Sequence, residues 1–297
     1  LSALRIDPRK TAQQIESFLK RKLANLKRQG LILGLSGGLD STLAAYLAVR
    51  AVGKDKVRLI NLPDRDSKSK HITHARMTAR ELGVSLETRD ITPILQEMGI
   101  YRLLPGDHFP SQTLRAALFR FGKKLVGPDA PGGYLEAHLH PPADSWEARG
   151  NAYAMAKHRL RMILLYTQAE LHDLLVVGSA NRTEYLTGAF SQWGCDHCAD
   201  LMPLRHLYRS QLDPLARHLG IPDTIRNKPA DPDLLPGIDN KENLLGSFKD
   251  TDQILWGLEH GTPRQDLETH YPRELVEHIT SLMDHSRPLR ETPYTLE

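Results

Sequence analysis

Cysteine is scarce in this chain: Cys195 and Cys198 are the only two among 297 residues. A secreted domain that depends on disulfides normally carries more cysteine, so the count favours a reducing compartment and we expect a cytoplasmic protein. Long apolar runs are missing as well, because no stretch approaches the roughly 18 consecutive apolar residues of a membrane-spanning helix. We therefore expect no membrane as a partner.

A strong excess of charge of one sign is also missing. The 39 Lys and Arg residues against 36 Asp and Glu residues leave a net charge of +3. Since no strongly basic patch carries interleaved aromatic residues, we expect no nucleic acid as a partner. Hydrophobic residues make up 40% of the chain, which excludes a disordered protein and allows a large core. We expect one domain over residues 1–297.

Short apolar runs alternate along the chain with segments in which apolar residues recur at helical spacing. The runs predict buried strands and the spaced segments predict helices. Their alternation predicts an α/β fold: a mostly parallel, twisted sheet with helices on both faces and a ligand site at the carboxyl edge of the strands. The predicted strands cover 31–35, 57–62, 84–88 and 174–177, and the predicted helices cover 9–28, 40–50, 69–82, 151–172, 181–188, 206–219 and 264–284.

Two segments interrupt this alternation. Residues 100–150 are rich in proline and predict an insertion, with a helix over about 111–125 and a long loop. Residues 227–247 are rich in proline and aspartate, which fits either a mobile cover over a site or an ordinary surface loop.

The strongest chemical signal is Gly34–Ser41, with the sequence GLSGGLDS, between a predicted strand and a predicted helix. Ser36, Gly37 and Gly38 allow a tight turn whose amide groups, together with the start of the helix, attract an anion such as phosphate. The pattern is neither a Walker A loop nor a dinucleotide-binding glycine motif. The alternative is a plain Ser/Gly turn capped by Asp40. Beside phosphate groups, a carboxylate at position 40 is useful only if it holds Mg²⁺.

A second strand–turn–helix segment spans residues 177–185. Ser179 or Asn181 can cap the new helix. Glu184 follows in its first turns, where it is either a second carboxylate for the same Mg²⁺ or a glutamate that pairs with solvent or the helix dipole.

Taken together, these motifs resemble those of ammonia-dependent NAD synthetases, which belong to the pyrophosphatase-loop superfamily of ATP-binding proteins. The resemblance runs from about residue 12 to 287 outside the insertion, and it implies a Rossmann-like fold of the adenine nucleotide alpha hydrolase type. The motifs that carry it are Ser36–Ser41, Arg159–Met162, Gly178–Glu184, Thr187–Phe190 and Ala199–Leu204.

The resemblance implies a ligase that uses ATP to activate the carboxylate of deamido-NAD. An acyl-adenylate forms with release of pyrophosphate, and ammonia then displaces AMP to give NAD. It also implies a homodimer. Only about thirty residues precede the glycine turn, so we expect ammonia to come from solution or from a separate partner.

The resemblance also assigns roles to individual residues. It implies Asp40, Ser36 and Arg159 as catalytic residues, and Asp40 with Glu184 as the Mg²⁺ ligands. The ATP-binding residues that it implies are Gly34, Leu35, Ser36, Gly37, Gly38, Leu39, Asp40, Ser41, Ser179 and Arg209. The deamido-NAD-binding residues that it implies are Arg159, Gln192, Asp200 and His285.

Several positions depart from the family pattern. Gln192, Arg209 and Ser286 each stand where the family has Lys, and Asp231 stands where it has Thr or Ser. The glycine turn that would bind ATP therefore matches the family pattern better than the residues assigned to the acceptor, deamido-NAD. Two alternatives stay open: an adenylating enzyme of the same superfamily with another acceptor, and a nucleotide-binding relative without catalysis.

The two cysteines, Cys195 and Cys198, lie in one short segment of the acceptor half. Their spacing fits either part of a metal knuckle, which would need His197 or His206 as further ligands, or two thiols in a loop.

Overall fold

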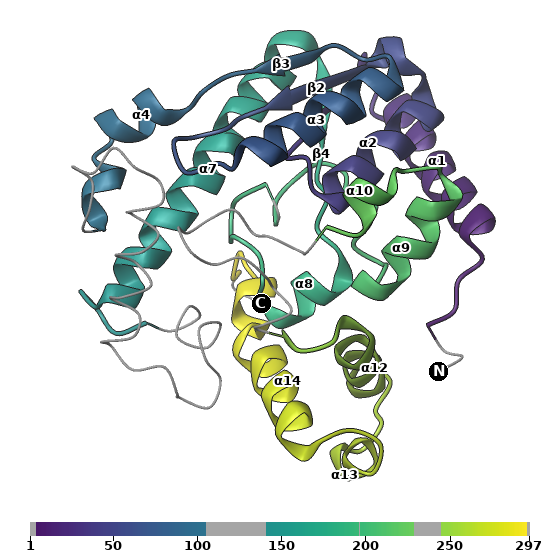
Figure 1. The fold of residues 1–297 in the computed structure, drawn as a ribbon, viewed down its shortest axis with the longest axis vertical. Helices are drawn as coiled ribbons and strands as arrows, with labels where there is room; N and C mark the ends of the chain where they lie inside the picture. The colour runs from purple at the N-terminus through teal and green to yellow at the C-terminus, as the bar shows by residue number, and fades with distance from the viewer. Residues whose placement is uncertain (1–3, 105–140, 196, 229–244, 296–297) are drawn as a thin grey trace.

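Four parallel strands form one sheet in the computed structural model, which describes residues 4–104, 141–195, 197–228 and 245–295 (Figure 1). The strands are β1 (Gly30–Gly34), β2 (Val57–Asn61), β3 (Leu86–Thr88) and β4 (Leu174–Val177), in the order β3-β2-β1-β4. In the register, Gly34 lies opposite Ile60 and Leu33 lies opposite Val177. The predicted parallel α/β sheet is confirmed, and all four predicted strands are present, with β3 shorter than the predicted 84–88.

Helices cover both faces of this sheet because β1 is buried on both sides. Leu31 and Leu33 pack into one core with α1 (Pro8–Asn25), α2 (Leu39–Val52), α3 (Ser69–Leu82) and α9 (Arg209–His218). Ile32 points to the opposite face, where it packs with α7 (Trp146–His172). Successive side chains of a strand alternate between faces, so a continuous apolar run supports helices on both.

A smaller group of helices lies beyond the carboxyl edge of the sheet, at the bottom of Figure 1. A separate apolar core, with Ile254, Val276 and Ile279 at its centre, holds it together. The group contains α8 (Arg182–Thr187), α12 (Phe248–Glu259), α13 (Arg264–Glu268), α14 (Arg273–His285) and α15 (Arg287–Arg290). The remaining short elements are η1 (Lys54–Lys56), α4 (Thr92–Glu97), η2 (Ile100–Leu103) and α10 (Asp223–Arg226).

Several helix predictions need correction. The helix predicted over 264–284 is two helices, because Pro272 begins α14 after a break. The helix predicted over 206–219 begins at Arg209, and the one predicted over 151–172 begins at Trp146, where Ser145 caps it. Helices α4 and α12 were not predicted.

The structure describes only the two flanks of the predicted insertion at 100–150, which are residues 100–104 and 141–150. Tyr101 is 1% exposed and packs in the α7 core, and α7 begins at Trp146, so both flanks belong to the fold. The helix predicted over 111–125 and most of the 227–247 segment, including Asp231, lie outside the described residues.

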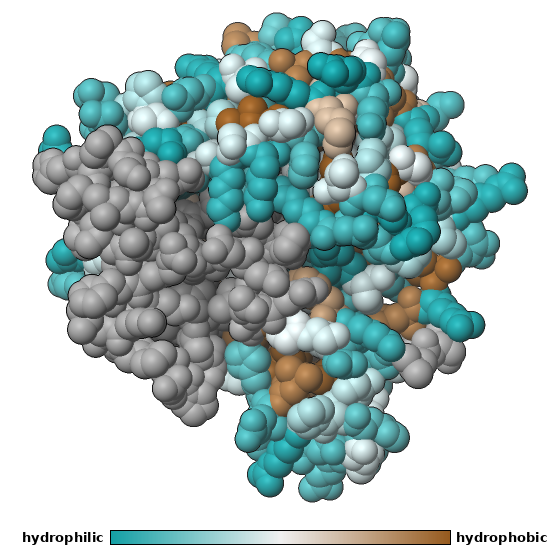
Figure 2. Space-filling view, in the orientation of Figure 1, coloured by the Kyte–Doolittle hydropathy of each residue, from teal (hydrophilic) through white to brown (hydrophobic). Residues whose placement is uncertain are grey.

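The described atoms on the face shown in Figure 2 are mostly hydrophilic, with apolar residues scattered among them. Within the described residues, no helix is both long and apolar enough to cross a membrane.

Candidate active site

The glycine turn joins β1 to α2 at the carboxyl edge of the sheet. The amide of Leu35 donates to the carbonyl oxygen of Ile60 (2.8 Å), which extends the β1–β2 pairing into the turn. Ser36 Oγ lies 2.9 Å from Ser41 Oγ and accepts from the amide of Gly38 (3.3 Å). The two hydroxyl groups thus fold the turn back onto the first turn of α2.

Gly37 fits this turn for two physical reasons. Its φ is +78°, in the left-handed region that favours glycine. A Cβ at this position would also lie only 2.1 Å from the carbonyl oxygen of His71 in α3. The turn therefore rests directly on the backbone of α3, and any larger residue would displace one of them.

The start of α2 is open to an anion. Gly38 occupies the N-cap position, and no side chain in the described structure caps this helix. Helix N-termini present unpaired amide groups and a partial positive charge, which favour phosphate. The alternative of a plain turn capped by Asp40 is wrong on this point, since Asp40 does not cap the helix.

Asn181 joins the two predicted metal-binding carboxylates. Its side-chain amide donates to Asp40 Oδ2 (2.9 Å), and its Oδ1 accepts from the amide of Glu184 (3.0 Å). Glu184 Oε2 in turn accepts from the amide of Asn181 (3.2 Å), which forms a capping box at the start of α8. Asn181 is fully buried. Asp40 and Glu184, far apart in the chain, therefore both bond to Asn181, the first through its side-chain amide and the second through its backbone amide.

This arrangement fits Mg²⁺ bound together with a nucleotide. No group of three or more His, Cys, Asp or Glu side chains in the described part of the chain is placed to hold a metal ion. Mg²⁺ commonly takes only one or two carboxylates from the protein and completes its shell with phosphate oxygens and water. Asp40 and Glu184 are the two carboxylates of this region that could serve in that way.

Arg209 lies at the start of α9, close to α8. Its amide donates to Thr183 Oγ1 (2.9 Å), and Thr183 in turn donates to Asp252 of α12. Burial raises the pKa of Asp252 despite the hydrogen bonds from Ser210 and Thr183, because the carboxyl group is fully enclosed. Ser179 lies in the turn between β4 and α8, half-buried.

Lys228 is a further cation at the glycine turn that the sequence did not single out as a site residue. Its Nζ donates to the carbonyl oxygen of Gly37 (3.3 Å). Lys228 also contributes to lowering the pKa of His74 on α3, where burial is the larger cause. In the sequence it stands three positions before Asp231, in the segment predicted as a possible cover, where its charge could offset that of Asp231 near the phosphates.

Two of the residues predicted to bind deamido-NAD, Arg159 and Gln192, lie in contact. Arg159 Nε donates to the carbonyl oxygen of Gln192 (3.1 Å), and the Gln192 side chain donates to Thr292 Oγ1 (3.2 Å). Arg161 instead donates to the carbonyl oxygen of Leu62 (3.0 Å). Arg159 and Arg161 thus point in different directions, as residues two positions apart on a helix do.

Asp200 and His285 bond to other parts of the protein. Asp200 accepts from Tyr166 (3.0 Å) and from the amide of Val176 (2.8 Å), which fixes it beside β4. Burial and the nearby Asp200 carboxylate raise the pKa of Tyr166. His285 ends α14 in an exposed position, with Nδ1 2.8 Å from the carbonyl oxygen of Ser281.

The cysteine segment packs against α7. Cys195 Sγ lies 3.2 Å from His158 Nδ1, and neither cysteine forms a disulfide bond. Among the described residues, neither cysteine forms part of a group of three or more His, Cys, Asp or Glu side chains placed to hold a metal ion.

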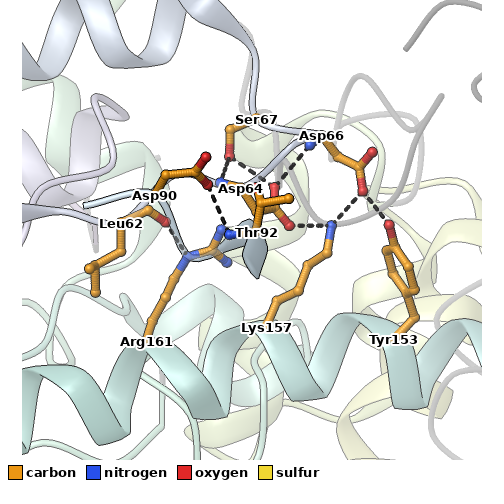
Figure 3. Close-up of polar contacts among 9 residues, drawn as sticks. All are labelled: Leu62, Asp64, Asp66, Ser67, Asp90, Thr92, Tyr153, Lys157 and Arg161. Carbon is orange, nitrogen blue, oxygen red and sulfur yellow. Dashed lines mark hydrogen bonds and ion pairs between the residues drawn. The ribbon is translucent and has the colours of Figure 1, made fainter. Parts of the chain in front are cut away.

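Sequence reasoning missed a buried charged cluster beside Arg159 (Figure 3). Lys157 is 0% exposed and pairs with Asp64 (2.6 Å) and Asp66 (2.8 Å) in the segment that follows β2. Tyr153 also donates to Asp66. In the sequence, Lys157 stands close to Arg159 and Arg161, and a helical segment with so many cationic residues is ordinarily expected to face solvent. The helical spacing of Tyr153, Lys157 and Arg161 was the available signal.

Residues 11–104 and 142–293 match the model of a family described as NAD synthase. The chain is 36% identical over 290 residues to the NH(3)-dependent NAD(+) synthetase of Coprothermobacter proteolyticus, covering 96% of this chain and 97% of that relative. It is also 36% identical over 288 residues to the enzyme of the same name from Thermotoga maritima, covering 96% of this chain and 99% of the relative.

Solved structures show the same fold. The NH3-dependent NAD synthetase from Campylobacter jejuni superposes with a TM-score of 0.70 at 22% identity, and the NMN synthetase from Francisella tularensis with a TM-score of 0.72 at 21% identity. Each match covers 99% of this chain and 100% of the other chain. At such identities the structures support the fold alone.

Proposed function

Because the chain belongs to the NAD synthase family, we propose that the glycine turn, Asp40 and Glu184 form the ATP site of its reaction. That reaction is the ATP-dependent amidation of deamido-NAD by ammonia to give NAD. The observation that carries the assignment is the pair of hydrogen-bonded contacts by which Asn181 joins Asp40 to the start of α8.

The chemistry proceeds in two displacements. The carboxylate oxygen of deamido-NAD attacks the α-phosphorus of ATP, the bond to the β-phosphate oxygen breaks, and pyrophosphate leaves. Ammonia then attacks the acyl carbon of the adenylate, loses a proton, and AMP leaves with the bonding electrons. Neither step needs a covalent nucleophile from the protein, so its task is to position two anionic substrates and to balance charge.

The described residues suit that task. The uncapped start of α2 offers amide donors to the phosphates, and Lys228 supplies positive charge beside Gly37. Mg²⁺, when bound with ATP, would neutralise phosphate charge, and Asp40 and Glu184 are the residues that would hold it. Ser179 and Arg209 are proposed at the edge of the same site, since both lie next to α8.

The family assignment is tested by the full reaction. Purified protein with deamido-NAD, ATP, Mg²⁺ and ammonium is expected to form NAD and pyrophosphate in equal amounts. Release of pyrophosphate without NAD, or release that depends on a different carboxylic acid, would favour the alternative of another acceptor. Binding of ATP without turnover under any of these conditions would favour a non-catalytic relative.

Arg159 is proposed as a deamido-NAD contact, with Gln192, Asp200 and His285 also on the acceptor side. Replacing Arg159 by Met is expected to raise the KM for deamido-NAD about 10- to 100-fold, since a hydrogen bond to a charged group contributes about 1.5–3 kcal/mol. The KM for ATP should change little. Initial rates with each substrate varied in turn measure both constants.

Arg217→Met is the matched control for that substitution. Arg217 is an exposed arginine on α9 in an i,i+4 pair with Asp213, and such pairs contribute little to stability. An unchanged KM for deamido-NAD in the Arg159 variant, or an equal change in both variants, would exclude Arg159 from the acceptor site.

A homodimer is proposed through the outer face of α7. Ile163 is 61% exposed and Leu171 is 69% exposed, and both lie on one stripe of this helix because they are two steps of i,i+4 apart. Replacing both by Glu is expected to convert a dimer to a monomer in sedimentation velocity. The control is Met98→Glu, at a residue that is 54% exposed after α4. A monomeric wild type, or a double variant that stays dimeric, would contradict this surface.

We further propose that residues 1–297 act as one domain in the cytoplasm. The amide of Ser210 in α9 donates to Asp252 in α12, which joins a helix of the sheet core to the smaller group of helices and supports a single unit. Two cysteines without a disulfide are compatible with a reducing compartment.

A further inference from the structure

We propose that Lys157 is a positioning residue: its buried pairing with Asp64 and Asp66 holds α7 and the glycine turn at a fixed spacing. This inference rests on the proposed roles of Arg159 and of the turn. Lys157 itself touches neither substrate in the proposal, and it acts through the segment 62–67 that lies between the two halves of the site.

The contacts of the Lys157 side chain hold it in one position. Its side chain is fully enclosed, with Nζ 2.6 Å from Asp64 and 2.8 Å from Asp66 (Figure 3). Nζ also lies 4.3 Å from the centre of the Tyr153 ring, and the Tyr153 hydroxyl donates to Asp66. Two carboxylates, one ammonium group and one phenol thus define the distance between α7 and the segment after β2.

Three turns of α7 take part in this contact. Tyr153, Lys157 and Arg161 are spaced four residues apart and so lie on one face of the helix. Arg161 donates to the carbonyl oxygen of Leu62 (3.0 Å), at the start of the same segment. Arg159 points the other way and contacts Gln192. The rotation of α7 that serves the buried cluster is therefore also the rotation that presents Arg159 to the acceptor side.

The elements on either side of the segment held by Lys157, β2 and α3, both touch the glycine turn. On the side of β2, the Asn61 side chain donates to the carbonyl oxygen of Leu35 (2.7 Å). On the side of α3, the carbonyl oxygen of His71 lies against Gly37, where even a Cβ would come within 2.1 Å. A displacement of residues 62–67 would therefore be transmitted to the phosphate-binding backbone.

The charged cluster is expected to fix the position of the segment more than to stabilise the folded protein. Burial raises the pKa of Asp64, but Lys157 and Arg161 outweigh it, so the pKa is lowered and the carboxylate stays charged. Burying three charges is costly, and replacing such clusters by apolar groups is often neutral for stability. Within the segment, Asp64 also accepts from the amide of Asp66 (3.1 Å) and from Ser67 Oγ (3.2 Å), so its position is set by several bonds at once.

The experiment compares kinetics with stability in two variants. Lys157→Met keeps the length of the side chain but removes the ammonium group that the two buried carboxylates share, so it should lower the melting temperature. The triple variant Lys157→Met/Asp64→Asn/Asp66→Asn removes all three charges and should regain most of that loss. We expect both variants to show a KM raised for ATP and for deamido-NAD, with kcat/KM lowered about 10- to 100-fold, as misplacement of reacting groups by about 1 Å causes.

The results that would overturn the inference can be distinguished from one another. A folded Lys157→Met protein with wild-type kcat and KM overturns the inference, and so does a triple variant that recovers both its melting temperature and its activity. Lys20→Met, at an exposed position of α1, is the matched control for loss of a lysine. If the single variant does not fold, Tyr153→Phe removes only the hydroxyl that bonds Asp66, and unchanged constants in that variant together with recovery of the triple variant count against Lys157.

The proposed function is tested separately by the wild type and the Lys20 variant, which must both form NAD. If neither does, the proposed function fails while calorimetric ATP binding still tests the inference. ATP should bind at least about 5-fold more weakly to Lys157→Met than to the wild type if the glycine turn has moved. Equal ATP affinity in the two proteins would overturn the inference in that case.

Discussion

Replacing Asp40 by Asn is expected to lower kcat for NAD formation at least about 100-fold, comparable to the loss of a major electrostatic contact in other active sites. The substitution keeps the size of the side chain and its hydrogen bond from Asn181 but removes the charge that would hold Mg²⁺. Continuous assay of NAD formation at saturating ATP, deamido-NAD and ammonium measures the loss. The Mg²⁺ concentration for half-maximal rate should also rise in any residual activity.

Asp55→Asn is the control for this charge change, because Asp55 is an exposed residue of η1 away from the turn. It should leave kcat and the Mg²⁺ dependence unchanged. Wild-type activity that persists after removal of divalent cations by a chelator, or an Asp40→Asn protein with more than about a tenth of wild-type kcat, would contradict a metal-binding role for Asp40.

The second large effect is expected for Gly37→Ala. The new Cβ would lie 2.1 Å from the carbonyl oxygen of His71, and both atoms belong to backbone or are fixed to it, so the turn or α3 must move. The left-handed φ of +78° adds strain of about 1–2 kcal/mol for a residue other than glycine. We expect ATP affinity to fall at least about 10-fold and kcat/KM at least about 100-fold, with a lower melting temperature. Isothermal calorimetry with ATP and thermal unfolding measure these effects.

The control variant Gly53→Ala separates the effect of backbone strain from the effect of displacing the glycine turn. Gly53 also has a left-handed φ, of +86°, but a Cβ there would meet nothing within 4 Å. This control should lower the melting temperature modestly and leave ATP binding intact. If the Gly37 and Gly53 variants behave alike, the contact between Gly37 and α3 does not set the shape of the phosphate site.

The structure explains two of the departures from the family pattern, at positions 192 and 286, in physical terms. The contact between Arg159 and position 192 uses the backbone carbonyl oxygen, which Gln and Lys supply equally. Ser286 is fully buried and donates to the carbonyl oxygen of Leu186, and Arg290 donates to the same oxygen (both 2.8 Å). The buried serine thus donates a hydrogen bond to a carbonyl group at the end of α8. A lysine there would have to bury a charged ammonium group, which is costly.

The sequence predicted those parts of the protein that local pattern encodes. The apolar run before Gly34, the glycine turn and the helix after it follow from residues that are neighbours in the chain, as does the parallel α/β sheet from repeated alternation. Where the pattern was weak, the prediction was wrong: Pro272 divides one predicted helix, and the segment that became α12 was not recognised as a helix.

Contacts between distant segments were decided only by tertiary structure. Nothing in the neighbourhood of Asn181 shows that its side chain will reach Asp40, and nothing near Lys157 shows that it will be enclosed by Asp64 and Asp66. A charged side chain is ordinarily expected in solvent, because the cost of burying it is recovered only when a partner of opposite charge arrives from elsewhere in the chain. The residue types and the order of elements were therefore set by the sequence alone, whereas the meeting of the two halves of the site depended on how the sheet, α3 and α7 pack together.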